Sequence, residues 1–299
     1  MLFSRQPSRR EAVLGGGLVG AVALAAWPGG VASPRAHGSP ARIPAPARLG
    51  QAPSGPAPSS IEIADLTWPD VRDAIARGWR TAIVPTGGLE QNGPHLVIGK
   101  HDRVVHWAAM RIAAELGDAL VAPVVSYVPE GDYSPPTGHM GFPGTLGVTP
   151  AVFEGVLDGI ARSLKAGGFD MVCFLSDHGG SLSAQDRVAG RLSEEWATSG
   201  PRVFGVSAYY SDALERDYLL SQGESAAALG QHAGLADTAE LLAVDPAGVD
   251  LARLPDSSEV LAKLGGSGNP HRASAAHGAA LMGLRIEAAV RQIRDARTA

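Results

Sequence analysis

Hydrophobic positions along residues 81–209 alternate between the spacing of strands and the spacing of helices. Short, continuous apolar runs predict strands, and apolar residues that repeat every three or four positions predict helices. The predicted strands are residues 81–85, 120–125, 171–175 and 203–209, and the predicted helices are residues 103–116, 150–166 and 184–197. Such alternation is typical of a mostly parallel sheet with helices on both faces. The sequence therefore predicts an α/β fold with three layers, α/β/α.

The apolar residues 12–27 belong to a different kind of segment. Arg5, Arg9 and Arg10 form a positively charged start before them, and small residues with proline follow. This layout is typical of a secretory signal, and the apolar stretch is short for a membrane-spanning helix. Residues 8–14 resemble the twin-arginine export signal. The pattern predicts an exported, periplasmic protein.

The predicted organisation has three parts. Residues 1–36 are the signal, cleaved after Ser33 or Ala36, which leaves no stable membrane association; an uncleaved segment would instead be a membrane anchor. Residues 37–60 are rich in Pro, Ala, Ser and Gly, which predicts a flexible linker. Residues 61–299 are long enough for one sizeable α/β domain.

Composition narrows the classes of partner. The chain has 25 Lys and Arg against 30 Asp and Glu, so it lacks the basic surplus that attracts nucleic acid. Aromatic residues make up 5%, which argues against stacking platforms for bases. The single cysteine, Cys173, lies in an apolar strand pattern, so a buried hydrophobic role is favoured over a nucleophile. We expect a small-molecule substrate.

Polar clusters follow the predicted strands. The first contains Glu90, His95, His101 and Asp102, just after the strand at residues 81–85. Further clusters that combine His with Gly occupy residues 137–145, 176–181 and 231–237. Carboxylates mixed with imidazoles suit Zn²⁺, Mn²⁺ or Fe²⁺, and the carboxyl ends of strands are where α/β proteins build sites. Any one histidine here could be an ordinary surface residue, but together the clusters predict a divalent-metal site.

Several blocks resemble the creatininase (creatinine amidohydrolase) family. Residues 88–96, which contain Glu90-Gln91-Asn92-Gly93-Pro94-His95, resemble the family signature Glu-Gln-His-Gly-Pro-His, and Asp102 matches the Asp that follows it. Further blocks follow in family order at residues 142–145 (Phe-Pro-Gly-Thr), 177–180 (Asp-His-Gly-Gly), 232–239 (from His-Ala-Gly) and 269–275. The resemblance implies the creatininase-like fold and a closed homo-oligomer, often a hexamer.

The resemblance also implies metal ligands. Glu90, Asp102 and His178 stand at ligand positions, with the Asp bridging two ions where both are bound. The family His between Gln and Gly is Asn92 here, and amides are weak ligands for Zn²⁺-like ions. The cofactor is therefore one or two divalent ions per chain.

Two further residues can replace missing ligands of a second ion. Creatininase has a Glu two residues after its ligand His, where this chain has Gly180. Relatives with Gly there draw a carboxylate from the position of Asp237, and His101 can supply the missing imidazole.

The implied reaction is attack of metal-activated water on the carbonyl of a small, in some cases cyclic, amide. His232 is the candidate acid/base, because the ordinary pKa of His lies near neutral pH. His139 precedes the Phe-Pro-Gly-Thr loop, where it closes over the substrate or packs the loop.

Two other functions compete with this one. A lactone or other small-ester hydrolase would use the same scaffold on a different bond. A non-catalytic periplasmic binding protein would fit the replacements Asn92 and Gly180. Against it stand the retained residues Glu90, Asp102, His178 and His232.

Overall fold

A computed structural model describes residues 53–298 of the chain. All of these belong to one unit, Ile43–Ala299. The predicted signal, residues 1–36, lies outside the described residues, as does most of the predicted linker. Export, the linker and the homo-oligomer therefore stay predictions. Within the described range, no helix is both long and apolar enough to cross a membrane.

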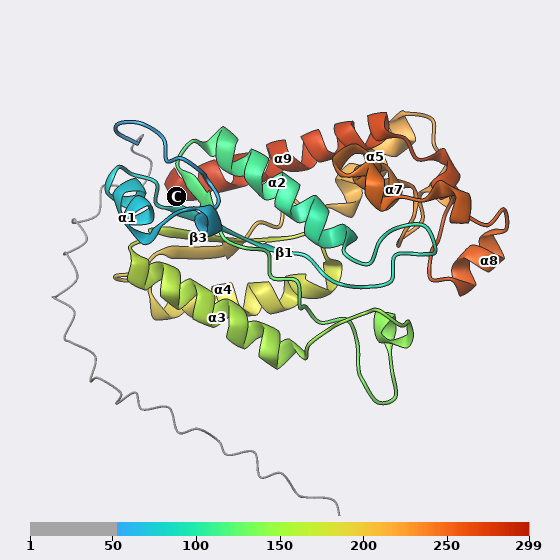
Figure 1. Cartoon of the computed structure of the whole chain (residues 1–299), viewed down its shortest axis with the longest axis horizontal. Helices are drawn as coiled ribbons and strands as arrows, with labels where there is room; N and C mark the ends of the chain where they lie inside the picture. Colours follow the sequence, from blue (N-terminus) through green and yellow to red (C-terminus); the bar gives the residue numbers. More distant parts are fainter. Residues whose placement is uncertain (1–52, 299) are drawn as a thin grey trace, which may run out of the picture. The chain divides into compact units, whose positions relative to one another are not determined.

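A parallel sheet forms the centre of the domain (Figure 1). Its strands are β1 (Thr81–Thr86), β2 (Ala119–Val121), β3 (Met171–Ser176) and β4 (Arg202–Gly205), in the order β2-β1-β3-β4. Each neighbouring pair is parallel, as the alternating sequence pattern predicts. Thr86 of β1 pairs with Ser176 of β3, so these two central strands end at the same level.

Helices cover both faces of this sheet. In Figure 1, α2 (Lys100–Leu116) and α9 (Ala275–Thr298) lie on one side, and α3 (Pro150–Gly167) and α4 (Leu182–Glu195) lie on the other. The side chains of the buried strand β3 contribute to the hydrophobic cores on both faces of the sheet. Met171, Cys173 and Leu175 pack in the core under α2 and α9. Val172 and Phe174 pack in the core under α3 and α4. This period of two is the ordinary alternation of side chains along a strand. The predicted three-layer α/β/α fold is confirmed.

Two predicted strands are shorter than expected. The prediction for residues 120–125 gave one strand, but β2 ends at Val121 because Pro123 has no N–H for the ladder. The chain still runs beside β1, where the Val125 N–H donates to the Pro85 carbonyl at 2.9 Å. Strand β4 ends at Gly205, and a turn closed by Tyr209 N–H and the Val206 carbonyl replaces the predicted extension.

Helix α2 begins three positions earlier than the apolar spacing predicts. It starts at Lys100 and ends at Leu116, and the next residue, Gly117, has a φ of 76°, the left-handed conformation that glycine adopts without strain. The early start places Lys100, His101 and Asp102 in the first turn. Each of the three therefore projects from a rigid element beside the end of β1.

The remaining helices extend the domain beyond the sheet. They are α1 (Trp68–Ala76), α5 (Asp212–Ser221), α6 (Ala226–Leu229), α7 (Leu235–Val244) and α8 (Ser258–Lys263). Short 3-10 helices also occur in the loops, and η2 (Gly138–Gly141), between β2 and α3, contributes to the site described below. Helix α7 packs against α9 so closely that a Cβ on Gly278 would lie 1.8 Å from the Ala239 carbonyl oxygen. Glycine is required at that crossing.

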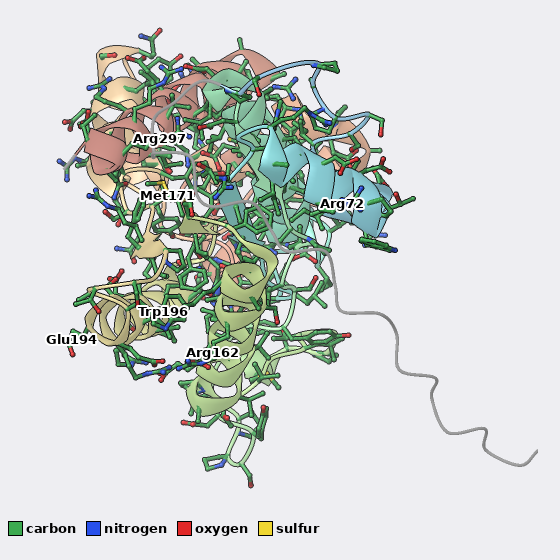
Figure 2. The ribbon with its side chains drawn as sticks, turned by 90° about the vertical axis from the view of Figure 1, so that its left-hand side faces the viewer. Arg72, Arg162, Met171, Glu194, Trp196 and Arg297 are labelled. Atoms are coloured by element: carbon green, nitrogen blue, oxygen red, sulfur yellow. The ribbon has the colours of Figure 1, made fainter. Side chains whose placement is uncertain are left out.

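The two outer helices on the α3 face are joined by polar contacts. Figure 2 shows Arg162 of α3 beside Trp196 at the end of α4. Arg162 donates to Glu195 at 2.6 Å and lies over the Trp196 ring. At the amino ends of the strands, Arg297 of α9 donates to Asp118 at 2.5 Å. These contacts lie away from the carboxyl ends of the strands, where the polar sequence clusters gather.

A buried ionic network connects α9 to the carboxyl end of β3. Arg285, with a side chain 2% exposed, donates to Glu240 of α7 and to Asp177, in each case at 2.8 Å. Its Nε donates to the Tyr209 carbonyl oxygen at 3.0 Å. Two buried carboxylates therefore depend on one guanidinium.

This dependence predicts a large loss of stability for Arg285→Met. The variant keeps the apolar stem but leaves Glu240 without its direct counter-charge and Asp177 with only His101 and Tyr209 as direct partners, so urea unfolding should show a loss of about 3–5 kcal/mol. The matched control is Arg291→Met, because Arg291 pairs with Glu287 at the surface of the same helix, where loss of a pair costs about 0–1 kcal/mol. Equal losses in the two variants would contradict the role of Arg285.

Candidate metal centre

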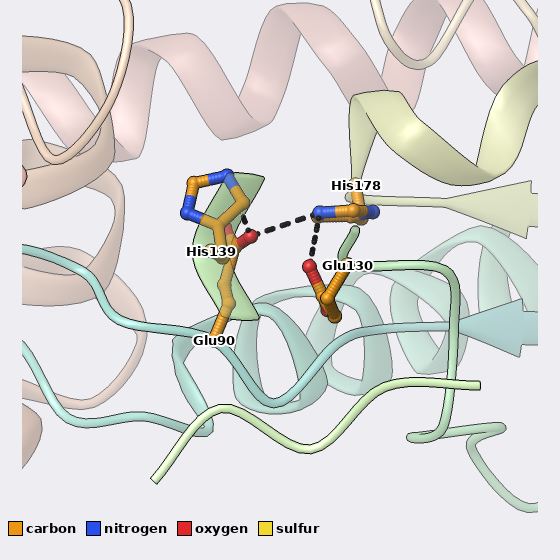
Figure 3. A group of neighbouring side chains, drawn as sticks. All are labelled: Glu90, Glu130, His139 and His178. Carbon is orange, nitrogen blue, oxygen red and sulfur yellow. Dashed lines mark hydrogen bonds and ion pairs between the residues drawn. The ribbon is translucent and has the colours of Figure 1, made fainter. Parts of the chain in front are cut away.

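The polar clusters meet at the carboxyl ends of β1 and β3. Glu90 lies in the loop after β1, His178 lies just after β3, and His139 lies in η2. Glu130, from the segment that follows β2, completes the group. One ligand atom from each of these four residues lies within 4.8 Å of the others (Figure 3). Four segments that are distant in sequence thus converge on one small volume.

The Glu90 carboxylate is the centre of this group. Its side chain is 1% exposed, and Oε2 lies 3.0 Å from His178 Nε2 and 3.1 Å from His139 Nε2. The other oxygen, Oε1, lies 2.7 Å from His101 Nε2 and 3.7 Å from His232 Nδ1. Glu90 is therefore surrounded by imidazoles on both oxygens. Sequence analysis predicted each of these residues, but not that all of them would share one carboxylate.

Glu130 is the site residue that sequence analysis missed. Its side chain is fully buried, and Oε2 lies 3.1 Å from His178 Nε2. Neither oxygen has a hydrogen bond of good geometry among residues 53–298. A buried carboxylate without such partners is costly, which is the condition that a bound cation relieves. Glu130 follows the strand next to β1 and precedes Gly131, but it stands outside every recognisable motif block.

Two glycines after β1 make room for carboxylates. A Cβ on Gly88 would lie 2.9 Å from Glu130 Oε1, and one on Gly87 would lie 1.9 Å from Asp102 Oδ1. Side chains at these positions would displace both groups. The Gly87-Gly88 pair is therefore a steric requirement of the site.

Charge balance sets the pKa values of the central groups. Burial lowers the pKa of His178, but Glu130 and Glu90 outweigh burial and raise it to about 10. Burial raises the pKa of Glu130 to about 7, and the nearby Glu90 charge adds to this although His178 opposes it. Burial alone would raise the pKa of Glu90, but His101 and His178 hold it well below its usual range. Without an ion, the group therefore holds protons between its carboxylates and imidazoles.

His101 bridges the carboxylates of Glu90 and Asp177. Its Nδ1 lies 2.9 Å from Asp177 Oδ2 and its Nε2 lies 2.7 Å from Glu90 Oε1. Both partners are acceptors, so each ring nitrogen donates a proton, and the carboxylates raise the pKa of His101 against the effect of burial. The structure thus brings His101 to the centre, where both of its nitrogens are engaged. Its predicted role as a ligand stays a prediction.

Asp102 and Asp237, predicted as ligands, are not in the four-residue group. The Asp102 carboxylate accepts a hydrogen bond from the Gly88 N–H at 3.0 Å, which fastens α2 to the loop after β1. Asp237 on α7 forms an ion pair with Lys100. Ligation by either residue stays a prediction.

The two predicted catalytic histidines lie side by side at the exposed edge of the group. Their ring centroids are 4.5 Å apart, with side chains 29% exposed for His139 and 23% for His232. His232 Nε2 donates to the Gln91 carbonyl at 2.7 Å, so its Nδ1 is left with a lone pair. The structure therefore places both histidines where solvent and a substrate can reach them.

Gln91 fixes the tautomer of His139. The amide oxygen of Gln91 accepts from the Gly93 N–H at 3.0 Å, so its amide nitrogen faces His139 Nδ1 at 3.0 Å and donates to it. His139 Nε2 therefore carries the proton, which points at Glu90. A ring held in this way is a proton donor toward the centre rather than a free ligand nitrogen.

The donor set fits a divalent ion. Glu90, Glu130 and His178 supply two carboxylates and one imidazole, all buried, and the unsatisfied oxygens of Glu130 provide the negative charge that a cation would balance. Carboxylate and imidazole donors are suited to Zn²⁺ and Mn²⁺, and three protein ligands leave a position for water. The predicted divalent cofactor agrees with this geometry.

The sequence profile described as "Creatininase: Creatinine amidohydrolase" matches residues 64–293. The chain belongs to the creatininase family. Family membership assigns it to the metal-dependent amidohydrolases, and it confirms the resemblance in the sequence blocks. The profile covers the three layers and every residue of the metal centre.

Relatives within the family differ in what they act on. The chain is 32% identical over 123 residues to a mycofactocin precursor peptide peptidase of Mycolicibacterium smegmatis, a match that covers 40% of this chain and 47% of that protein. It is 27% identical over 202 residues to a creatinine amidohydrolase of Pseudomonas putida, covering 66% of this chain and 76% of that enzyme. The first match thus spans about half the length of the peptidase.

Solved creatininase structures share the fold. One creatinine amidohydrolase structure superposes with a TM-score of 0.64 at 22% identity, covering 79% of this chain and 97% of that one. Others of similar score are a manganese form of creatininase and a zinc–zinc form of a creatininase mutant. The α/β/α architecture of this chain is therefore that of creatininase.

The raised pKa values of Glu130 and His178 predict how ion binding depends on pH. A divalent ion must displace the protons that these groups retain up to about pH 7 and about pH 10. Without metal, the same raised values stabilise the fold below the ordinary pKa values, and this contribution is lost as pH rises through the folded values. The melting temperature of the metal-free protein should therefore fall between about pH 6 and pH 9, while the increase caused by Mn²⁺ or Zn²⁺ should grow.

Glu130→Gln tests the carboxylate directly. The variant keeps the shape but loses the charge, so affinity for Mn²⁺ should fall by more than the ~10–100-fold typical of residues that only support a ligand. Isothermal titration measures this, with Glu154→Gln as the control, because Glu154 pairs with Arg187 at the surface of α3. Unchanged Mn²⁺ affinity in Glu130→Gln would exclude Glu130 as a ligand.

Proposed function

We propose that this creatininase-family chain hydrolyses the C–N bond of a small amide, with water activated at one divalent ion held by Glu90, Glu130 and His178. The observation that carries the proposal is the convergence of these three buried donors beside two partly exposed histidines. When bound with an open coordination position, such an ion lowers the pKa of water to about 7 and polarises a carbonyl oxygen. Amide hydrolysis also needs a group that delivers a proton to the leaving nitrogen, and a histidine held beside the ion can supply it.

His232 is suited to transfer the proton. Its Nε2–H bond to the Gln91 carbonyl orients the ring and leaves Nδ1 free to accept a proton near Glu90. The same nitrogen can then deliver that proton to the leaving nitrogen, which amide cleavage needs more than ester cleavage does. The main-chain N–H of His232 lies 3.0 Å from Ser267 Oγ, so its backbone is held as well.

His139 is suited to bind the carbonyl group of the substrate. Because Gln91 donates to its Nδ1, His139 carries its proton on Nε2, which lies 3.1 Å from Glu90 Oε2 and can donate instead to a substrate oxygen bound beside Glu90. A donor held in advance toward the reacting oxygen stabilises the negative charge that develops there. This arrangement of two histidines with fixed, opposite proton roles favours an enzyme over a binding protein on a decayed scaffold.

The substrate class is proposed from the chemistry of the site and from the family. Relatives named as peptide peptidases and as creatinine amidohydrolase both cleave C–N bonds, one in a peptide and one in a small ring. The centre lies between polar loops. Of the four described tryptophans, Trp79, Trp107 and Trp196 pack in or against separate apolar cores, and Trp68 is exposed on α1. We propose a short peptide-like or cyclic amide, with a lactone as the second candidate because it presents the same carbonyl.

A substrate panel tests the reaction class. Protein freed of metal with a chelator and reloaded with Mn²⁺ or Zn²⁺ should release amine from members of a panel of short peptide amides and cyclic amides. The metal-free protein should be inactive on the same compounds. Higher kcat/KM on lactones than on every amide, or activity that survives metal removal, would contradict the proposed function.

His232→Ala separates acid/base chemistry from metal binding. If His232 transfers the proton, kcat on the best amide should fall by ~10²–10⁴ while metal content stays that of the unaltered protein. The loss should appear in kcat because the interaction belongs to the transition state. His271→Ala is the control, since His271 is an exposed histidine that contacts the Pro255 carbonyl. A parallel loss of metal, or turnover equal to that of the control, would exclude the acid/base role.

A further inference from the structure

Lys100 is buried and directly precedes His101, which contacts Glu90, but it is not a member of the four-residue group. It lies in the first turn of α2, its side chain is 1% exposed, and its ammonium pairs with Asp237 of α7. Lysine is almost never fully buried unless it is paired. It lines a cavity of about 500 Å³ that also borders Asp177 and Glu240. A permanent positive charge is thus built into the wall beside the site.

Three carboxylates from three segments gather around this charge. Asp237 and Glu240 come from α7, one turn apart, and Asp177 follows β3 directly before His178. All three act electrostatically on Lys100, while Arg285 neutralises Asp177 and Glu240 by direct contacts. Converging carboxylates in proteins commonly hold a divalent cation. Here the direct partner of Asp237 is an ammonium group.

The residues that could hold a second ion do not fit one. Asn92 turns its amide nitrogen to the Glu90 carbonyl at 3.0 Å, and Gly180 has no side chain. Asp102 accepts from the Gly88 N–H, and Asp237 is engaged by Lys100. Asn92 is therefore a weak ligand, Gly180 offers no donor, Asp237 is paired with a cation, and both ring nitrogens of His101 are engaged, so among the residues predicted for a second ion only Asp102 keeps a carboxylate with free acceptor sites.

We propose that the ammonium of Lys100 takes the place of a second divalent ion, so that the centre works with one metal ion and one fixed lysine cation. This inference rests on the proposed function, which supplies the single ion at Glu90, Glu130 and His178. An ammonium holds Asp237 by charge and hydrogen bonds but cannot activate a water molecule. The ion pair of Lys100 with Asp237 thus holds α2 against α7, and only the single metal ion activates water.

Metal stoichiometry tests this arrangement. Protein dialysed against Mn²⁺ and then freed of loose ions is analysed for manganese per chain by elemental analysis, with isothermal titration of Mn²⁺ as the second readout. The unaltered protein should bind one tight Mn²⁺. Lys100→Ala removes the ammonium from the group of carboxylates, Asp237, Asp177 and Glu240, that borders the cavity, so the variant should bind a second Mn²⁺ there. That gain should vanish in Lys100→Ala/Asp237→Asn. Lys263→Ala, at an exposed pair with Glu259, is the control and should bind one.

Asp237→Asn provides a second test that keeps Lys100 in place. Under the proposal it holds one Mn²⁺, like the unaltered protein, because Asp237 ligates no ion. Two tight ions in the unaltered protein with one in Asp237→Asn would overturn this inference and leave the proposed function intact. A folded Lys100→Ala that binds a single Mn²⁺ would also overturn it. An unaltered protein that binds no Mn²⁺ or Zn²⁺ would overturn both the proposed function and the inference.

Discussion

A single buried carboxylate, Glu90, determines how the rest of this site is built. A charge of this kind is costly to remove from water unless groups of opposite charge surround it. Glu90 meets the requirement with His178 and His139 on one oxygen and His101 on the other. Those contacts fix the position of each imidazole and leave Glu130 as the oxygen donor that still lacks a partner of good geometry among the described residues. A cation bound beside Glu130 would balance the negative charge of this carboxylate.

The fold supplies the rigidity that this arrangement needs. Strands β1 and β3 end at the same level, so Glu90 and His178 emerge beside each other although they are far apart in sequence. Behind them, His101 contacts Asp177, and Asp177 accepts a hydrogen bond from Arg285 of α9. The chain of contacts therefore runs from the reactive edge, through the buried centre, to the longest helix. Gly87 and Gly88 allow the close approach that this packing requires.

The sequence predicted the elements better than the contacts between them. The alternating periods predicted the α/β/α layers, because burial of one helix face or of a whole strand leaves a direct trace in the residue pattern. They did not predict the early start of α2, since Lys100, His101 and Asp102 are polar and break the apolar spacing. The motif blocks brought out Glu90, His178, His139 and His232, which the structure places together.

Contacts made only in three dimensions could not be predicted in this way. Glu130 belongs to no motif, and its position depends on a loop that returns to β1. The pairing of Lys100 with Asp237 joins residues more than a hundred positions apart, and it is invisible in a linear pattern. Asp102 shows the reverse: it matches a motif position, yet the fold directs its carboxylate to the Gly88 N–H.

The most direct test of this account is an anomalous difference map from a crystal of the protein loaded with Mn²⁺ or Zn²⁺. The account predicts one strong peak per chain, bounded by side-chain atoms of Glu90, Glu130 and His178, with His139 and His232 beside it and not bonded to it. A peak bounded by Asp102 or Asp237 would contradict it, and so would a second peak of equal height at the Lys100 position.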